Sequence, residues 1–517
     1  MNHIKISFAT PPMLRLYGYS PDSPEAIFDQ VQSGCQPSSL RGDFIVVAEG
    51  TDAQSGKPLT VFITSVISAV PYYYVMTDTT CVHGPMIIDC VRRAGLTWQW
   101  NWSAIGQIAL FDHVLGDASL HPQVQRVPAA SIVIIRGTQR EFMTEPFWQN
   151  LYHQSGGHTS ISDAADMLVA LLGELPSYKP LSLSLSAGYD SRVLLAGLAY
   201  LKRTAQTACM GAPDATDPRI AERLARVIGY GYHRVALSTD QYVSEAERIL
   251  AMTSGEKVFC HWHTGIYAHT VGFDPQGVHL AGSNGEFARS YFFDKGFVAR
   301  MMDVLPIGHG DWWLARGHAA PRTVGEVVRH IDPQSPFAQA LDIRAQLASV
   351  YPPYLNFGDG MDVFYAMQRV RNFIGLGMAL YRADFPTMSP FLDVRFIQVM
   401  ARLRRQDKLA NAMHRGIIEK LQPTLLTFPT DETDVPMGAR PSGMYFRRPR
   451  PIKGYSRSTE AQRLPQVRQW AHRGFRLLGG SESSAEVSAV VERWNLGITV
   501  GAFSELLQRS GVNDVAD

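Results

Sequence analysis

The residue types best suited to phosphate chemistry lie in one short segment of the chain. Apolar residues predict a strand at positions 181–185 and a helix at 192–201, and between them stand Ser186, Ala187, Gly188, Tyr189, Asp190 and Ser191. Gly188 and Ala187 let the backbone approach an anion closely, and the first N–H groups of a helix attract negative charge. The segment therefore predicts a phosphate-binding loop, with Ser186 and Ser191 as hydroxyl donors.

Asp190 adds a further requirement to this loop. A carboxylate repels phosphate unless a divalent cation lies between them, so Asp190 predicts Mg²⁺ at the same site. Serine, glycine and aspartate also form ordinary helix caps, and that plainer interpretation stays open at this point.

The elements around the loop fall into two parts. Short strands separated by turn residues are expected at 44–48, 59–64, 72–76 and 130–135, which predicts an α+β or mainly β domain over residues 1–150. From about residue 160, helices alternate with strands, which predicts a doubly wound parallel sheet. The last third reads as mostly helical, so the second domain spans residues 151–517.

Composition excludes several classes of partner and location. The 517 residues carry 48 Lys and Arg against 47 Asp and Glu, so no nucleic acid or anionic membrane is expected as the main partner. Residues 58–77 lack charge, but their β-branched and aromatic residues predict two strands rather than a membrane helix. Five irregularly spaced cysteines and the absence of a secretion signal predict a cytoplasmic protein without a disulfide framework.

The loop resembles a known family. Ser-Ala-Gly-Tyr-Asp-Ser is similar to the Ser-Gly-Gly-x-Asp-Ser pyrophosphate loop of ATP pyrophosphatases, with one glycine replaced by alanine. The segments that follow resemble the asparagine synthetase-like branch of that family. They are a strand ending in Cys209, Met210 and Gly211, a helix with Asp217 as N-cap and Gly229 at its end, a Gly-rich turn with Gly282 and Glu286, and the Pro-Phe-Leu-Asp element 390–393.

The resemblance implies a ligand for each segment. The loop and Gly282 would bind pyrophosphate, the backbone at 209–211 would bind adenine, and Asp190 and Glu286 would bind Mg²⁺, Glu286 standing where the family has aspartate. Lys453 lies where the β-lactam-forming members carry a lysine that stabilises the transition state, although a solvated basic loop is an equal alternative. Tyr381 and Asp384 do not match the spacing of the family's catalytic Tyr–Glu pair, so the general base is left unassigned.

Residues 70–74 and 115–120 resemble parts of a glutamine amidotransferase-like domain of the Ntn-type sandwich fold. Glutamine hydrolysis in that domain needs a cysteine as the mature N-terminal residue, whereas position 2 is Asn2 and the nearest cysteine, Cys35, is internal. The first domain is therefore expected to lack glutaminase activity, and the amine must come from another source.

These features predict an ATP- and Mg²⁺-dependent ligase that adenylates a carboxylate, releases pyrophosphate and forms an amide. Relatives without the cysteine are β-lactam and carbapenam synthetases and lasso-peptide cyclases, so the leading hypothesis is closure of a lactam or macrolactam ring in natural-product biosynthesis. The substrate would be a small molecule or peptide carrying carboxylate and amine, with a precursor peptide or a protease as partner. Two alternatives remain: amidation of a sugar acid in surface-polysaccharide assembly, and a catalytically silent nucleotide-binding scaffold.

Cys260, His261 and His263 form a separate group of candidate metal ligands. They lack a second ligand pair at the spacing of structural zinc sites, so a packed aromatic segment beside the substrate pocket is the preferred interpretation.

Overall fold

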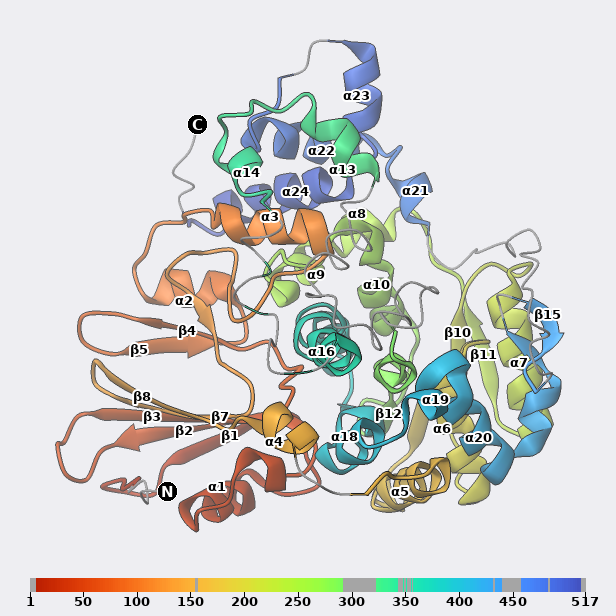
Figure 1. Ribbon diagram of the computed structural model, residues 1–517. Coiled ribbons are helices and arrows are strands. Elements are labelled where there is room, and N and C mark those ends of the chain that lie inside the picture. Colours follow the sequence, from red (N-terminus) through yellow and green to blue (C-terminus); the bar gives the residue numbers. More distant parts are fainter. Residues whose placement is uncertain are drawn as a thin grey trace.

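The computed structural model describes residues 6–153, 157–291, 322–342, 357–430, 433–438, 457–481 and 484–512, together with Leu347, Val350 and Leu355. It is a mixed α/β structure whose described strands form two antiparallel sheets before residue 150 and a parallel sheet after it, with a short hairpin near residue 430. Figure 1 shows the antiparallel sheets and the parallel sheet on two sides of the molecule, with the helix α16 (Phe357–Phe364) between them.

The larger antiparallel sheet has the strand order β1-β2-β3-β7-β8, and the smaller one the order β5-β4-β6. Their bounds are β1 (Met13–Tyr19), β2 (Asp43–Thr51), β3 (Pro58–Thr64), β4 (Tyr73–Met76), β5 (Cys81–Gly84), β6 (Gln125–Arg126), β7 (Ser131–Arg136) and β8 (Gln139–Thr144). The helices of this part are α1 (Pro24–Gln32), α2 (Ile87–Arg93), α3 (Trp102–Phe111) and α4 (Phe147–His153).

The central strands of the larger sheet are buried on both faces. Phe44 and Val46 of β2 pack on one face with Ile27 and Phe28 of α1, and Ile45 packs on the other with tyrosines of the smaller sheet. Alternating apolar side chains on two covered faces explain the uncharged stretch 58–77, which forms β3 and β4 as predicted. No described helix is long and apolar enough to cross a membrane. The Ntn-type sandwich and the boundary at residue 150 stay predictions.

The predicted parallel sheet is confirmed. Its strands, in the order β11-β10-β9-β12-β13, all run parallel. They are β9 (Leu181–Ser184), β10 (Gln206–Met210), β11 (Tyr232–Val235), β12 (Val278–Leu280) and β13 (Thr387–Met388). The helices among them are α5 (Ile161–Gly173), α6 (Tyr189–Tyr200), α7 (Thr216–Ile228), α8 (Gln241–Ser244), α9 (Ala246–Thr253) and α10 (His263–Thr270).

One helix start differs from its prediction. The N-cap of α7 is Ala215, not Asp217, because the helix begins at Thr216, one residue before the predicted cap. Asp217 thus lies inside the first turn, where its negative charge interacts favourably with the positive end of the helix dipole. The predicted end is confirmed, since Gly229 closes α7 with a φ of 81° that suits glycine.

The last third is mostly helical in its described residues, as predicted. Beside α16 it contains α13 (Arg322–Val328), α14 (Pro336–Gln339), α17 (Gly375–Arg382), α18 (Val394–Ala401), α19 (Arg405–Lys408), α20 (Ala412–Leu421), α21 (Ser458–Ala461), α22 (Pro465–Leu477), α23 (Ala485–Val491), α24 (Asn495–Arg509) and the hairpin β14 (Pro429–Thr430) and β15 (Thr433–Pro436). A ten-residue π-helix, η4 (Tyr365–Ile374), joins α16 to α17. Asp393 of the Pro-Phe-Leu-Asp element caps α18, a structural role.

The π-helix η4 connects the two parts of the molecule through buried polar contacts. Arg371 donates to the carbonyls of Gly116 and Val127, both at 2.8 Å. Asn372 accepts from the fully buried Arg126 at 2.7 Å. Nearby, Tyr73 OH donates to Glu256 at 3.0 Å. These contacts fix the antiparallel part against the helices that line the site described below.

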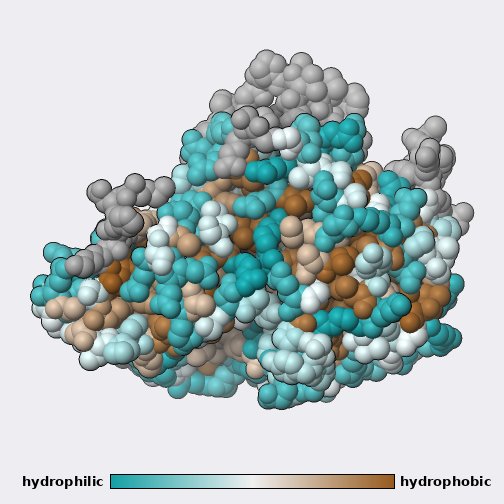
Figure 2. Space-filling view, turned by 90° about the horizontal axis from the view of Figure 1, so that it is seen from below, coloured by the Kyte–Doolittle hydropathy of each residue, from teal (hydrophilic) through white to brown (hydrophobic). Residues whose placement is uncertain are grey.

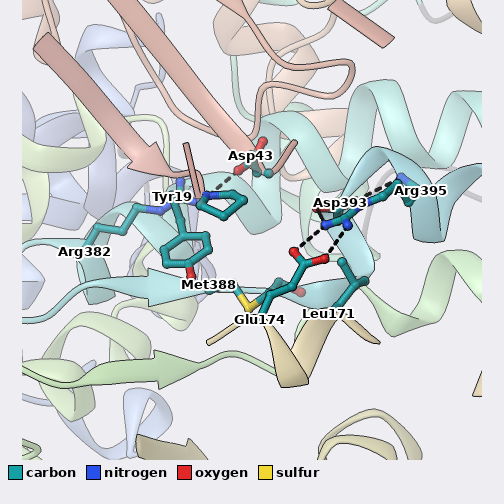
Figure 3. A pocket seen from close by; sticks show the side chains of 11 residues that line it. Tyr19, Asp43, Leu171, Glu174, Arg382, Met388, Asp393 and Arg395 are labelled. Carbon is teal, nitrogen blue, oxygen red and sulfur yellow. Dashed lines mark hydrogen bonds and ion pairs between the residues drawn. The ribbon is translucent and has the colours of Figure 1, made fainter. Parts of the chain in front are cut away.

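A second group of contacts lies at a small cavity between the two parts (Figure 3). Asp43 of β2 accepts hydrogen bonds from Arg382 of α17 at 2.8 Å and from the Ala69 N–H at 2.9 Å. Arg395 forms a bidentate pair with Glu174 at 2.6 and 2.9 Å.

Figure 2 shows the face of the molecule seen from below, where hydrophilic residues are interspersed with groups of apolar residues.

Asp43→Asn is expected to lower the free energy of unfolding by about 3 kcal/mol, because it leaves the Arg382 guanidinium, 11% exposed, without a counter-charge. The matched control is Glu222→Gln, which breaks the exposed 2.8 Å pair with Arg226 and is expected to cost less than about 0.5 kcal/mol. Urea denaturation compares the two variants. Equal losses would contradict a stabilising role for the buried pair.

Glu256 predicts a pH dependence of stability. Burial raises its pKa from 4.5 to about 7, so the folded chain holds this proton more tightly than the unfolded chain does. The resulting stabilisation is complete below about pH 4.5 and is lost as the pH rises through 7. Glu256→Gln should therefore match the wild type near pH 5 and be more stable than it at pH 8, whereas equal stability of the two at both pH values would refute the shift.

Candidate functional site

A cavity of about 490 Å³ lies at the carboxyl ends of β9 and β12. After β9, the next strands along the chain, β10 and β11, lie on one side of it, and the later strands β12 and β13 lie on the other side. The strand order therefore reverses between β9 and β12. Ligands of open parallel sheets bind in the crevice at such a switch point. Of the predicted site residues, the cavity is lined by Ser186, Gly188, Tyr189, Asp190, Ser191, Gly282 and Glu286.

The segment predicted to bind phosphate forms the turn between β9 and α6. Gly188 is the N-cap of α6, and Tyr189 begins the helix. The Ser186 N–H donates to Ser191 Oγ at 3.0 Å, and the Gly188 N–H donates to Ser186 Oγ at 3.1 Å. The two serine hydroxyls are 3.0 Å apart. Serine side chains thus hold the loop in shape with its helix terminus toward the cavity.

Asp217 accepts a hydrogen bond from the backbone of this loop, a contact that the sequence did not predict. The Ala187 N–H donates to the Asp217 carboxylate, which reaches it from the first turn of α7. Ala187 is fully buried and does not line the cavity. A carboxylate therefore binds an N–H group that was predicted to face phosphate, and the loop holds a negative charge of its own. No local pattern marks this contact, because the two residues are separated by 30 positions.

Glycine is required where the turn after β12 meets the phosphate loop. A Cβ at Gly282 would lie 2.9 Å from the Ser191 nitrogen, and one at Gly285 would lie 2.5 Å from Asp190 Oδ1. The backbone of Ser191 cannot give way easily, so Gly282 needs a residue without a side chain, whereas a Cβ at Gly285 would force the Asp190 side chain to move. The turn thereby brings Glu286 into the cavity that Asp190 lines.

The two predicted magnesium ligands differ in their contacts. Asp190 Oδ1 lies 2.8 Å from Nε2 of the fully buried His414, but this buried oxygen forms no hydrogen bond among the described residues. Glu286 accepts from Arg289 Nη2 at 2.6 Å through one oxygen and from Tyr365 OH through the other. Burial lowers the pKa of Arg289, but the charges of Asp190 and Glu286 outweigh it and raise the pKa overall.

A resident magnesium ion does not fit this donor set as it stands. Both oxygens of Glu286 are bound by protein donors, and Arg289 already supplies the positive charge beside the two carboxylates. Among the described residues, no group of three or more His, Cys, Asp or Glu side chains could hold a metal ion. The Mg²⁺ assignment of Asp190 and Glu286 stays a prediction.

The remaining predicted residues lie elsewhere. Cys209 and Met210 are in β10 and Gly211 follows it, at the carboxyl edge beside β9, but none of the three lines the cavity. Gly211 donates to the Val235 carbonyl at 2.9 Å. Lys453 lies outside the described residues. The adenine and transition-state assignments therefore stay predictions.

A second wall of the cavity comes from residues 257–264 and from α17. It includes Lys257, His261, His263 and Thr264. Burial lowers the pKa of His263 to about 4 and lowers that of His261 well below its usual value, so both rings are neutral near pH 7. The packed segment predicted at Cys260–His263 is thus present, whereas the importance of Lys257 was not anticipated.

The floor of the cavity contains another neutral histidine. His279 of β12 stacks against Tyr381 with ring centroids 5.0 Å apart, and its Nε2 lies 3.2 Å from Ser184 Oγ. Burial lowers the pKa of His279 to about 3. Tyr381 thus contacts a histidine ring, whereas Asp384 pairs with Arg248 at 3.2 Å.

No model of a protein family matches the chain, and no curated protein matches it. Among solved structures, NMN synthetase from Francisella tularensis matches with 12% sequence identity and a TM-score of 0.21, covering 40% of this chain and 93% of that one. A likeness at that score shows nothing about activity.

Gly285→Ala tests the close approach of the turn to the phosphate loop. The added methyl group would displace the Asp190 carboxylate, so we expect ATP affinity, measured by calorimetry, to fall roughly tenfold or more. The control is Gly173→Ala at the end of α5, where nothing lies within 4 Å of the new Cβ. Wild-type affinity in Gly285→Ala would show that the turn does not shape the nucleotide site.

Proposed function

We propose that this protein is an ATP-dependent ligase that activates a carboxylate as an acyl adenylate and joins it to an amine. The observation that carries the proposal is the strand, small-residue loop and helix terminus at the switch point of the parallel sheet. A helix N-terminus in this position is suited to phosphate groups. The resemblance of residues 186–191 to the pyrophosphate loop of ATP pyrophosphatases supports the same ligand.

The proposed reaction has two steps. In the first, a carboxylate oxygen bonds to the α-phosphorus of ATP and the bond to pyrophosphate breaks. In the second, an amine nitrogen attacks the acyl carbon, loses a proton and displaces AMP. The hydroxyls of Ser186 and Ser191 and the terminus of α6 would hold the departing pyrophosphate. The Asp217 carboxylate would stay on the Ala187 N–H, which does not line the cavity, and would fix the backbone of the loop.

Magnesium is part of the proposal as the ion that accompanies ATP. Asp190 is the carboxylate of the phosphate loop that would approach it. Glu286 could reach it only by leaving Arg289 and Tyr365, so no step is assigned to the metal.

The amine is proposed to belong to the substrate itself. The described cysteines before position 150, Cys35, Cys81 and Cys90, are internal to the chain, and an internal thiol cannot use its own α-amino group as base. Intramolecular closure of a lactam or macrolactam follows most simply from this, with a small molecule or peptide as substrate and a precursor peptide or protease as partner. Amidation of a sugar acid by free ammonia or an external amine is the intermolecular alternative.

The contacts of Glu286 favour the catalytically silent scaffold as a second candidate. Both oxygens of this predicted metal ligand are held by protein groups, one by Arg289 and the other by Tyr365. A chain that binds nucleotide without turnover would tolerate these contacts. The two candidates differ in whether pyrophosphate is released.

Exchange of labelled pyrophosphate into ATP, measured with a panel of amino and sugar acids, tests adenylation. The wild type should exchange with at least one acid. Asp190→Ala should lower that exchange by at least roughly a hundredfold, about 2.7 kcal/mol in the barrier, because the loop loses its carboxylate. The control is Asp166→Ala, on the exposed surface of α5. Nucleotide binding without exchange for any acid would favour the scaffold, and activity of Asp190→Ala within about tenfold would remove Asp190 from the site.

A further inference from the structure

Lys257 is a buried cation in the wall of the cavity, outside the predicted phosphate loop. Its side chain is 3% exposed, and it lies among the lining residues that surround the space for a ligand. The backbone beside it is fixed, because Trp262 Nε1 donates to the Lys257 carbonyl at 2.8 Å. A lysine is rarely buried to this extent unless its charge has a partner.

The partners of the Lys257 ammonium do not neutralise it. Nζ donates a long hydrogen bond of 3.5 Å to the Phe373 carbonyl, and the ammonium lies 4.5 Å from the centroid of the Phe373 ring. An ammonium has three donors, so this leaves capacity for a ligand. Gly377 lines the cavity beside it, and a Cβ there would meet Nζ at 3.5 Å, so a glycine keeps this side of the ammonium open.

The charged and titratable groups around Lys257 leave a net positive charge beside the cavity. Arg369 also lies over the Phe373 ring, with its guanidinium 4.4 Å from the ring centroid, and adds a second positive charge near Lys257. Cys260 is a neutral thiol because burial raises its pKa to about 12, and His261 and His263 are neutral because burial lowers theirs. Asp112 is the acid that acts on Lys257, and burial raises its pKa. Two cations thus face one carboxyl group whose ionisation is disfavoured.

We propose that the Lys257 ammonium is the binding residue for an oxyanion of the ligand in this cavity, a phosphate of ATP or a carboxylate of the acid substrate. Such an anion would take the donors that Phe373 leaves unused and would offset the charge of the wall. The identity of the cavity's ligands rests on the proposed function, whereas the anion site itself needs no turnover.

Binding to the full chain tests this site, with ATP, inorganic pyrophosphate and glutarate as probes in calorimetric titrations. Lys257→Met keeps the length and apolar stem of the side chain but removes its charge, and should weaken at least one probe roughly ten- to a hundredfold. Lys257→Arg retains the charge and should bind within about threefold of the wild type. The matched control is Lys57→Met, in the exposed turn between β2 and β3.

The pattern of loss identifies the source of the anion. Weaker binding of ATP and pyrophosphate assigns Lys257 to phosphate, and weaker binding of glutarate alone assigns it to a carboxylate. Wild-type affinity of Lys257→Met for all three probes, or failure of the wild type to bind any of them, would overturn the proposal. Thermal unfolding shows whether Lys257→Met is folded, and Lys257→Gln is the second variant if it is not.

The pH dependence of anion affinity in the wild type gives a second test of the site. Burial lowers the pKa of Lys257 to about 8, so its charge is present below that pH and lost above it. Affinity for the responsive probe should therefore fall between pH 7 and 9, whereas Lys257→Arg should stay nearly constant. A flat wild-type profile would exclude Lys257 as the binding cation. If the wild type binds the anions but shows no pyrophosphate exchange, the ligase proposal is refuted and the proposed anion site at Lys257 still stands.

Discussion

The close approach of two backbone turns at the carboxyl edge of the parallel sheet is the constraint on which the site depends. One turn follows β9 and starts α6, and the other follows β12 and carries Gly282 and Gly285. Because strand order reverses between these strands, the chain diverges there and leaves a crevice. Glycine at both positions lets the second turn come within reach of Ser191 and Asp190. The cavity, its acids and its helix terminus all follow from this contact.

The cavity also depends on the antiparallel part of the chain, although none of the described residues before position 180 lines it. The π-helix η4 binds that part through Arg371 and Asn372 and presents Phe373 and Ile374 to the cavity. π-helical turns are rare and are frequent at functional sites. The wider turn lets one helix segment contact two different surfaces. The antiparallel part thus supports the helix segment that lines the cavity.

Sequence reasoning predicted the parallel sheet, the loop and the end of α7 because each has a local signal. Apolar runs mark β9 and α6, and Gly229 marks a helix end. The partners of the loop could not be predicted in this way. Asp217 reaches Ala187 over 30 positions, and Phe373 reaches Lys257 over 116, so both contacts exist only after the sheet has formed. The choice of Glu286 as a metal ligand likewise took no account of Arg289, a partner supplied by the fold.

The proposed function depends on binding of nucleotide phosphates at the terminus of α6. A crystal structure of the chain with a non-hydrolysable ATP analogue would show where the nucleotide lies. We expect phosphate oxygens at Ser186, Gly188 and Ser191. A nucleotide bound elsewhere in the chain would contradict the proposal.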